Sequence, residues 1–209
     1  MKNLIKSAWA LVQENRRAYI ILNVIYYALV VVFMIYVAFN QALQKSLMEA
    51  VGAAFMTGPL SIVGQSYVNA QVFRAILVTF VVNLFIGSFG SITLPSLIIP
   101  FSGILVGIYR AILWGLILSP ADPELRLAMI PHSLTLLLEG QAYILTMLAA
   151  YIQGRAFLRP GTVGLEKHIN GYLEGLKRAG KIYVLVGLTL LVAAIYEVLE
   201  VVILIKLVR

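Results

Sequence analysis

The chain has 209 residues, of which 61% are hydrophobic and 12% charged, and its mean hydropathy is +0.95. Soluble domains carry about 25% charged residues, and a soluble fold of this length cannot bury so much apolar surface. The composition therefore excludes a water-soluble globular domain and predicts an integral membrane protein. The net charge of +7 does not indicate a nucleic-acid partner, because the basic residues lie between the apolar runs. The absence of cysteine excludes disulfides and thiolate metal sites.

Five apolar runs approach the roughly 20 residues that a membrane-spanning helix needs. In chain order they lie near residues 19–39, 72–92, 94–118, 127–153 and 182–205. We therefore expect a single all-α domain over residues 1–209, built as a polytopic transmembrane helical bundle of about five spans in the lipid bilayer. Residues 40–71 are moderately apolar but interrupted by glycines, which indicates either a re-entrant or a surface helix pair.

Two further segments have an apolar stripe at helical spacing. The stripe of the first segment is Leu4, Ile5, Ala8, Trp9 and Val12. That of the second is Leu165, Ile169, Tyr172, Leu173 and Leu176. Basic residues accompany both stripes, so we predict an interfacial amphipathic helix for each.

The distribution of charge predicts the orientation of the chain. Basic residues concentrate in the N-terminal segment and in the connection between the fourth and fifth runs, residues 154–181. Four runs separate the two basic segments, so both should lie on the same side of the membrane. The positive-inside rule makes that side cytoplasmic. We therefore expect a multi-pass protein of the cell membrane with a cytoplasmic N-terminus.

Ionisable residues inside the apolar runs are the candidates for function, because each costs about 2.5–3.5 kcal/mol at the centre of the bilayer. Arg110 should face the bundle interior, since its run has a ridge of small residues that invites close helix packing: Gly103, Gly107, Ala111 and Gly115. His132 and Glu139 share one face of the fourth run, and Glu197 and Glu200 share one face of the fifth. We predict that these five residues form one buried polar cluster with an Arg110–Glu139 ion pair.

Several roles are open to this cluster. It could set helix packing and register, or form a proton or ion pathway. His132, Glu139 and Glu197 are weak candidates for metal ligands. The sequence has neither an H-E-x-x-H helix nor a G-x-S-x-G turn, so no catalytic residue is assigned, no cofactor is expected and an enzyme is the least favoured role.

Three stretches within residues 76–200 match a known pattern. The first is Phe80-Val-Val-Asn83 followed by Gly87, Gly90, Pro100, Gly103 and Gly107; the second is Ile130-Pro131-His132 before a glutamate-bearing helix that ends in Gly154; the third is Ala193-Ala194-Ile195-Tyr196-Glu197. Together they resemble the stage II sporulation protein M family of polytopic membrane proteins. The family-matching positions are Asn83, Pro131, His132 and Glu197.

The resemblance implies a non-enzymatic membrane scaffold that assembles with other membrane or envelope proteins. Whether the protein forms a homo-oligomer is left open by the sequence. The main alternative is a small transporter or channel component that uses the polar cluster, and an intramembrane metal-dependent enzyme is a third.

Overall fold

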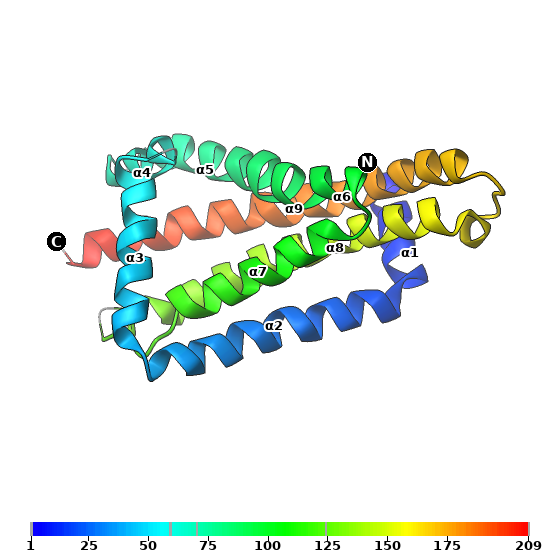
Figure 1. The fold of residues 1–209 in the computed structure, drawn as a ribbon. Helices are drawn as coiled ribbons and strands as arrows, with labels where there is room; N and C mark the ends of the chain where they lie inside the picture. The colour runs from blue at the N-terminus through cyan, green and yellow to red at the C-terminus, as the bar shows by residue number, and fades with distance from the viewer. Residues whose placement is uncertain (1, 59, 70, 124, 209) are drawn as a thin grey trace.

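The molecule is a bundle of helices that run side by side (Figure 1). The computed structural model describes residues 2–58, 60–69, 71–123 and 125–208, and every regular element among them is helical. The lengthwise elements are α2 (Arg16–Ala38), the continuous helix α5 (Val72–Val81), η1 (Val82–Thr93) and α6 (Leu94–Ile98), then α7 (Ser102–Ile117), α8 (Met129–Leu158) and α9 (His168–Val208). Except for the shorter α7, each is long and apolar enough to cross a membrane. The chain is therefore an all-α, multi-pass membrane protein, as its composition predicts.

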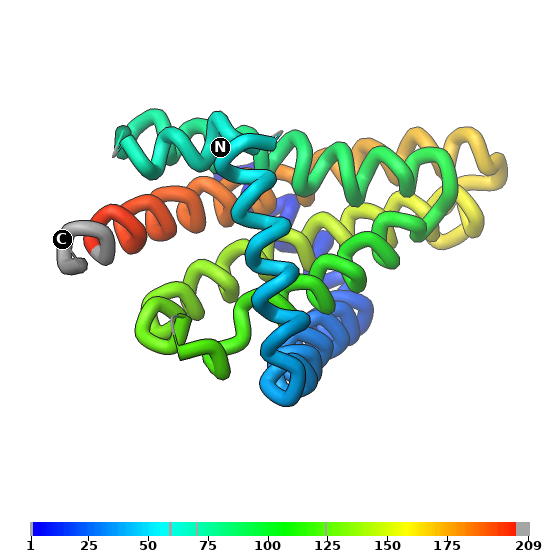
Figure 2. Tube along the Cα trace, turned by 60° about the vertical axis from the view of Figure 1, so that its left-hand side comes forward, coloured from blue at the N-terminus to red at the C-terminus, as the bar shows by residue number. Residues whose placement is uncertain are grey.

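The two ends of the bundle carry different elements. α1 (Lys2–Glu14) lies across one end, named here the N-terminal end, while α3 (Gln41–Met56) and α4 (Ser61–Val68) lie at the opposite, far end (Figure 1). α2 ends and α5 begins at the far end, so α3 and α4 add no crossing. These two helices are bent by 86° relative to each other, and Figure 2 shows α3 running across the bundle. The described residues of 40–71 therefore start and finish at the same end of the bundle, which both predicted arrangements, the re-entrant and the surface pair, require.

The boundary between the second and third crossings differs from the prediction. Residues 94–98, expected to open the third span, instead complete the second crossing as α6. Ile99, which precedes Pro100, has an extended backbone, because the proline ring disfavours a helical residue before it. Phe101 then adopts a left-handed conformation, with φ of 70°. Its ring packs against Gly154, where a Cβ atom would lie 2.9 Å from the ring.

α7 is held in the bundle by small residues. Gly103, Gly107, Ala111 and Gly115 are all buried. The backbone carbonyl of Ile92 in η1 is so close to Gly103 that a Cβ atom there would overlap it, and a Cβ at Gly115 would lie 2.5 Å from the carbonyl oxygen of Val30 in α2. α7 therefore packs backbone to backbone between two neighbours, as small-residue ridges allow in membranes.

The C-terminal end of α7 lies short of the far surface and is capped by α3. With 16 residues α7 is about 24 Å long, less than the roughly 30 Å of the hydrocarbon core. The Gln44 side chain of α3 is fully buried and donates to the carbonyl oxygens of Ile117, at 3.1 Å, and Ser119, at 2.9 Å. These bonds satisfy carbonyls that a helix terminus leaves without an intrahelical partner.

α8 is the central helix of the bundle. In its most apolar window 78% of the residues are buried, compared with 22% for α2. Every residue from Ala142 to Ala150 is buried. A helix enclosed by protein rather than lipid can hold polar side chains at membrane depth, provided that its neighbours pair with them.

α9 continues well beyond the fifth predicted span. Its 41 residues make a rod about 61 Å long. The predicted second amphipathic helix is the beginning of this rod, which follows η2 (Pro160–Val163). Gly171 and Gly175 face α8 there, whereas Ile169 and Leu173 of the predicted apolar stripe are exposed. The contact with α8 is therefore made by these glycines and by Tyr172 of the stripe, whose ring lies 5.6 Å from that of Phe157.

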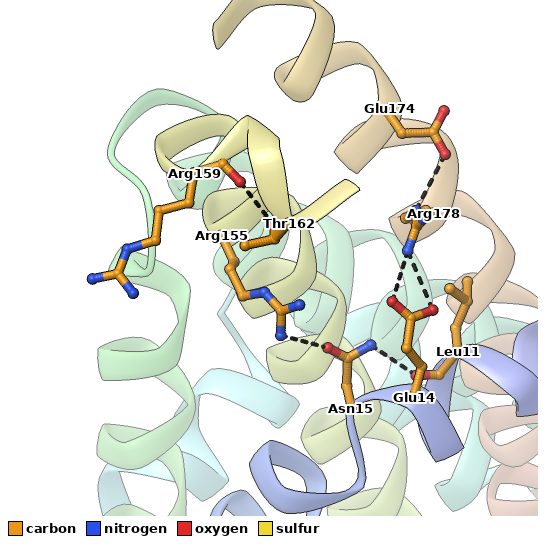
Figure 3. Close-up of polar contacts among 8 residues, drawn as sticks. All are labelled: Leu11, Glu14, Asn15, Arg155, Arg159, Thr162, Glu174 and Arg178. Atoms are coloured by element: carbon orange, nitrogen blue, oxygen red, sulfur yellow. Dashed lines mark hydrogen bonds and ion pairs between the residues drawn. The ribbon is translucent and has the colours of Figure 1, made fainter. Parts of the chain in front are cut away.

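α1 is fastened to the hairpin of α8 and α9 (Figure 3). Arg178 of α9 donates to both carboxylate oxygens of Glu14, at 3.0 and 3.2 Å, and to Glu174, at 3.2 Å. Arg155 of α8 donates to Asn15, which follows α1, at 3.2 Å. These contacts fix α1 across the N-terminal end.

Candidate functional site

A cavity of about 600 Å³ lies between η1 and α7. α8 forms its inner wall, and residues of α3 and α4 line it toward the far end. Its lining follows α7 from Val106 to Ile117, about 16 Å along the helix, and continues to Leu118. Ile86 and Tyr109, which also line it, are 59% and 63% exposed, so the cavity reaches the surface between these two helices.

Arg110 lies halfway along α7 and lines this cavity. Its Nη2 donates to the Gly87 carbonyl oxygen at 3.3 Å and to the Ser91 hydroxyl at 3.2 Å. The guanidinium carbon lies 4.2 Å from the centre of the Tyr143 ring, a cation–π contact. All three partners are electrically neutral.

The predicted ion pair between Arg110 and Glu139 is not formed. Both side chains line the same cavity, but among the described residues no carboxylate oxygen lies within 4.0 Å of the guanidinium. Tyr143, one helical turn beyond Glu139 on α8, occupies the position next to the guanidinium. Helical spacing had placed the two charges on facing helices, and the intervening aromatic ring keeps them apart.

The unusual helix η1 presents three cavity residues together. In this segment the backbone hydrogen bonds follow the wider i→i+5 pattern, which occurs often at functional sites. Asn83, Gly87 and Ser91 are four residues apart and all line the cavity. In the wider helix, residues four apart lie more nearly in line than in a regular α-helix. All three residues therefore share one face over two turns.

Glu139 is buried and receives a short hydrogen bond from η1. The Asn83 amide donates to its Oε1 at 2.6 Å, and the Tyr143 hydroxyl donates to the Asn83 carbonyl oxygen at 3.2 Å. Asn83 therefore links two residues of α8 that lie one turn apart. In this orientation the amide nitrogen meets a carboxyl oxygen and the amide oxygen meets a hydroxyl donor.

Glu197 of α9 joins this group and also lines the cavity. Its carboxyl group faces the Glu139 carboxyl and the Tyr67 hydroxyl. Its Oε2 atom is buried and has no hydrogen-bond partner among the described residues. Two carboxyl groups that face each other can bond only through a proton held by one of them. Tyr67 in turn contacts the Thr79 hydroxyl at 3.0 Å.

His132 and Glu200 form a separate pair nearer the far end. Nδ1 of His132 lies 3.1 Å from Oε1 of Glu200, and the Thr135 hydroxyl donates to Oε2 at 2.8 Å. His132 lines the cavity, whereas Glu200 is buried beside it. The carbonyl of Pro131 accepts from the Tyr196 hydroxyl at 3.1 Å. The predicted cluster is thus two neighbouring groups with Arg110 opposite them.

The weak metal candidates His132, Glu139 and Glu197 do not converge on one point. Within the part of the chain that the structure describes, no three His, Asp or Glu side chains are placed to hold a metal ion. Three residues of the site were missed in the sequence: Tyr67, Ser91 and Tyr143. The spacing of four residues between Glu139 and Tyr143 was the available signal, because it places both on one helix face.

No family model, curated protein or solved structure matches the chain. The resemblance to stage II sporulation protein M therefore stays a prediction. The function has to be inferred from the cavity and the groups that line it.

Proposed function

We propose that this protein is a small membrane transporter or channel component that accepts a polar ligand in the cavity between η1 and α7. The observation that supports this proposal best is the environment of Arg110. A cation halfway along an apolar helix meets only neutral partners, although two carboxyl groups line the same cavity. Charged groups at membrane depth usually pair with one another, and those that do not mark pathways or binding sites.

The dimensions and chemistry of the cavity suit a ligand. Its volume of about 600 Å³ falls in the range of small-molecule sites, which are mainly apolar with a few converging polar groups. Here the polar groups come from η1, α7, α8 and α9. The carboxyl groups of Glu139 and Glu197 can pass a proton between them, which is the chemistry that a proton-coupled transporter needs.

The orientation belongs to the same proposal. We place the N-terminal end of the bundle in the cytoplasm of the cell, because basic residues concentrate there. Arg155 and Arg178 lie at this end and fasten α1 (Figure 3). The far end, which α3 covers, then faces outward.

A non-enzymatic scaffold is the second candidate, and the hydrogen bonds between helices favour it. Asn83–Glu139 joins η1 to α8, and His132–Glu200 joins α8 to α9. Gln141 of α8 accepts from Tyr19 at 2.7 Å and donates to Asn23 at 2.6 Å, both on α2. Such bonds set helix register without any ligand, as a protein that holds other membrane or envelope proteins would require.

Access of water to the cavity separates the two candidates. The native chain has no cysteine, so single thiols can be introduced without a background. Val106→Cys and Leu113→Cys place a thiol in the cavity wall, and Leu105→Cys places one on the exposed apolar face of the same helix. A transporter should allow a membrane-impermeant methanethiosulfonate to modify both cavity thiols in proteoliposomes, but not the control.

The opposite result would favour the scaffold. If neither cavity thiol reacts with the impermeant reagent or with a maleimide that partitions into the bilayer, while a thiol in the N-terminal segment does react, the cavity is closed to ligands and the transport proposal is wrong. Adding the reagent to one side of the membrane at a time, with Lys6→Cys as the marker, tests the orientation in the same experiment.

A further inference from the structure

We infer that the ligand of this cavity is an amphiphile with an anionic head group, which enters from the bilayer between η1 and α7 and binds Arg110. The inference rests on the proposed function, because it names the ligand class for the same cavity. It depends on three features of the site: the free donors of Arg110, the apolar remainder of the wall and the position of the opening.

Arg110 has hydrogen-bond donors to spare. A guanidinium has five N–H groups in a planar fork, and both hydrogen bonds to η1 come from Nη2 alone. Among the described residues no hydrogen bond is made by its Nε or Nη1. Carboxylate and phosphate oxygens fit this fork geometrically, and an anion also supplies the charge that Gly87, Ser91 and Tyr143 lack.

Most of the remaining wall is apolar. Six aliphatic residues of η1, of α7 and of the position directly after α7 are among those that line the cavity: Val82, Ile86, Val106, Leu113, Ile117 and Leu118. A fully hydrophilic solute would have to leave most of its hydration shell to lie against them. A hydrocarbon chain can occupy that space without such a penalty.

The opening faces the membrane. The cavity reaches the surface at Ile86 and Tyr109, which lie on the lengthwise helices η1 and α7, and Tyr109 is adjacent to Arg110 in the sequence. Toward the far end the cavity is lined by Val51, Ala54 and Phe55, all on α3. The exposed route to Arg110 therefore leads between two transmembrane helices, where acyl chains are the neighbours.

Trp114 provides a reporter inside the site. It lines the cavity one turn from Arg110, and its ring centre is 5.9 Å from that of Tyr143. The only other tryptophan is Trp9, on α1 at the N-terminal end. The Trp9→Phe variant therefore has a single tryptophan, and bromine atoms on a nearby acyl chain would quench its fluorescence.

The test uses the full-length Trp9→Phe protein in phosphatidylcholine vesicles. Dibrominated phosphatidylglycerol, bromostearate and dibrominated phosphatidylcholine are each titrated in a separate series over the same range of mole fractions. We expect an anionic probe to reach half-maximal quenching at a several-fold lower mole fraction than the neutral lipid. Quenching by phosphatidylglycerol alone would identify a phospholipid, and quenching by bromostearate alone would identify a free fatty acid.

Variants connect the preference to Arg110. Arg110→Gln should abolish the preference, and Arg110→Lys should keep part of it, because a lysine retains the charge without the planar fork. Arg74→Gln is the matched control, since Arg74 is an exposed arginine of α5 that does not line the cavity. If Arg110→Gln does not fold, a weaker but persistent preference in Arg110→Lys still supports the inference.

Three outcomes would overturn it. Equal quenching by anionic and neutral lipids, or a preference that survives Arg110→Gln, would show that Arg110 does not select the ligand. Strong quenching by iodide, a water-soluble anion, without a preference among the lipids would mean that the cavity opens to water. That result would leave the transport proposal standing and remove only the amphiphile.

Discussion

The guanidinium of Arg110 lies above the ring of Tyr143, and the hydroxyl of that ring is bonded to Asn83, the residue that holds Glu139. A single tyrosine thus separates a cation from a carboxyl group and contacts the partners of both. This arrangement keeps the cation in the membrane interior without neutralising it. It also makes the contributions of the ring and the hydroxyl separable by substitution.

We predict that Tyr143→Phe is tolerated better than Tyr143→Leu. The phenylalanine loses one hydrogen bond, worth about 0.5–1.5 kcal/mol, but keeps the aromatic ring beside Arg110. The leucine also loses the cation–π contact, worth about 1–2 kcal/mol in a desolvated site. Reversible unfolding in mixed micelles would measure both. Equal stability of the two variants would show that the ring adds nothing beyond its hydroxyl.

The Asn83–Glu139 hydrogen bond predicts which of two substitutions costs more stability. Asn83→Ala leaves both the Glu139 carboxyl and the Tyr143 hydroxyl without their partner, which should cost about 1–3 kcal/mol. Glu139→Gln retains an oxygen that can accept from Asn83, so it should cost less. The same unfolding measurement tests this order, and a greater loss for Glu139→Gln would contradict the assigned bond. A proton-coupled transporter should nevertheless lose its activity with Glu139→Gln, whereas a scaffold should not.

Two glycines of α7 should differ in their tolerance of alanine. A Cβ at Gly103 would overlap the backbone carbonyl of Ile92, which cannot move without shifting η1. A Cβ at Gly107 would meet the side chain of Met147, which is flexible and can yield. Gly103→Ala should therefore lower the temperature of thermal unfolding in detergent several-fold more than Gly107→Ala does. Similar losses would mean that η1 and α7 are not packed as closely as described.

The attachment of α3 to the end of α7 gives a fourth prediction. Gln44→Leu removes the two hydrogen bonds to Ile117 and Ser119 and leaves these carbonyls without that donor. Hydrogen exchange of residues 41–56 should then become faster, because α3 loses its polar anchor. Gln41→Leu is the control, since Gln41 is exposed on the same helix. Unchanged exchange in Gln44→Leu would show that apolar contacts alone hold α3.

The fold could be predicted largely from hydropathy, because lipid requires long apolar helices wherever the chain crosses it. The break at Ile99–Phe101 could not, since both sides of it are equally apolar and the run alone does not show where the chain turns. Pro100 was the local signal, and its effect on Ile99 is the observed one. The sequence predicted two elements where the structure has the single helix α9, because the first turns of α9 are polar enough to suggest a separate helix.

The site was predictable in its charged members but not in their pairing. Arg110, Glu139 and Glu197 attract notice because charge is costly in lipid. Tyr143 does not, because a tyrosine in an apolar helix resembles packing. The wide turns of η1, which group Asn83, Gly87 and Ser91, depend on backbone hydrogen bonding that residue types do not specify.

The unbroken course of α9 has a mechanical consequence. Arg178 is hydrogen-bonded to Glu14 of α1, and Glu197 faces Glu139. The two α9 residues are nineteen positions apart, a separation of about 28 Å along the helix. A stiff helix transmits a tilt or rotation along its axis with little loss. A tilt of α1 would therefore move Glu197 relative to Glu139 through α9, with no loop between Arg178 and Glu197 to absorb the motion.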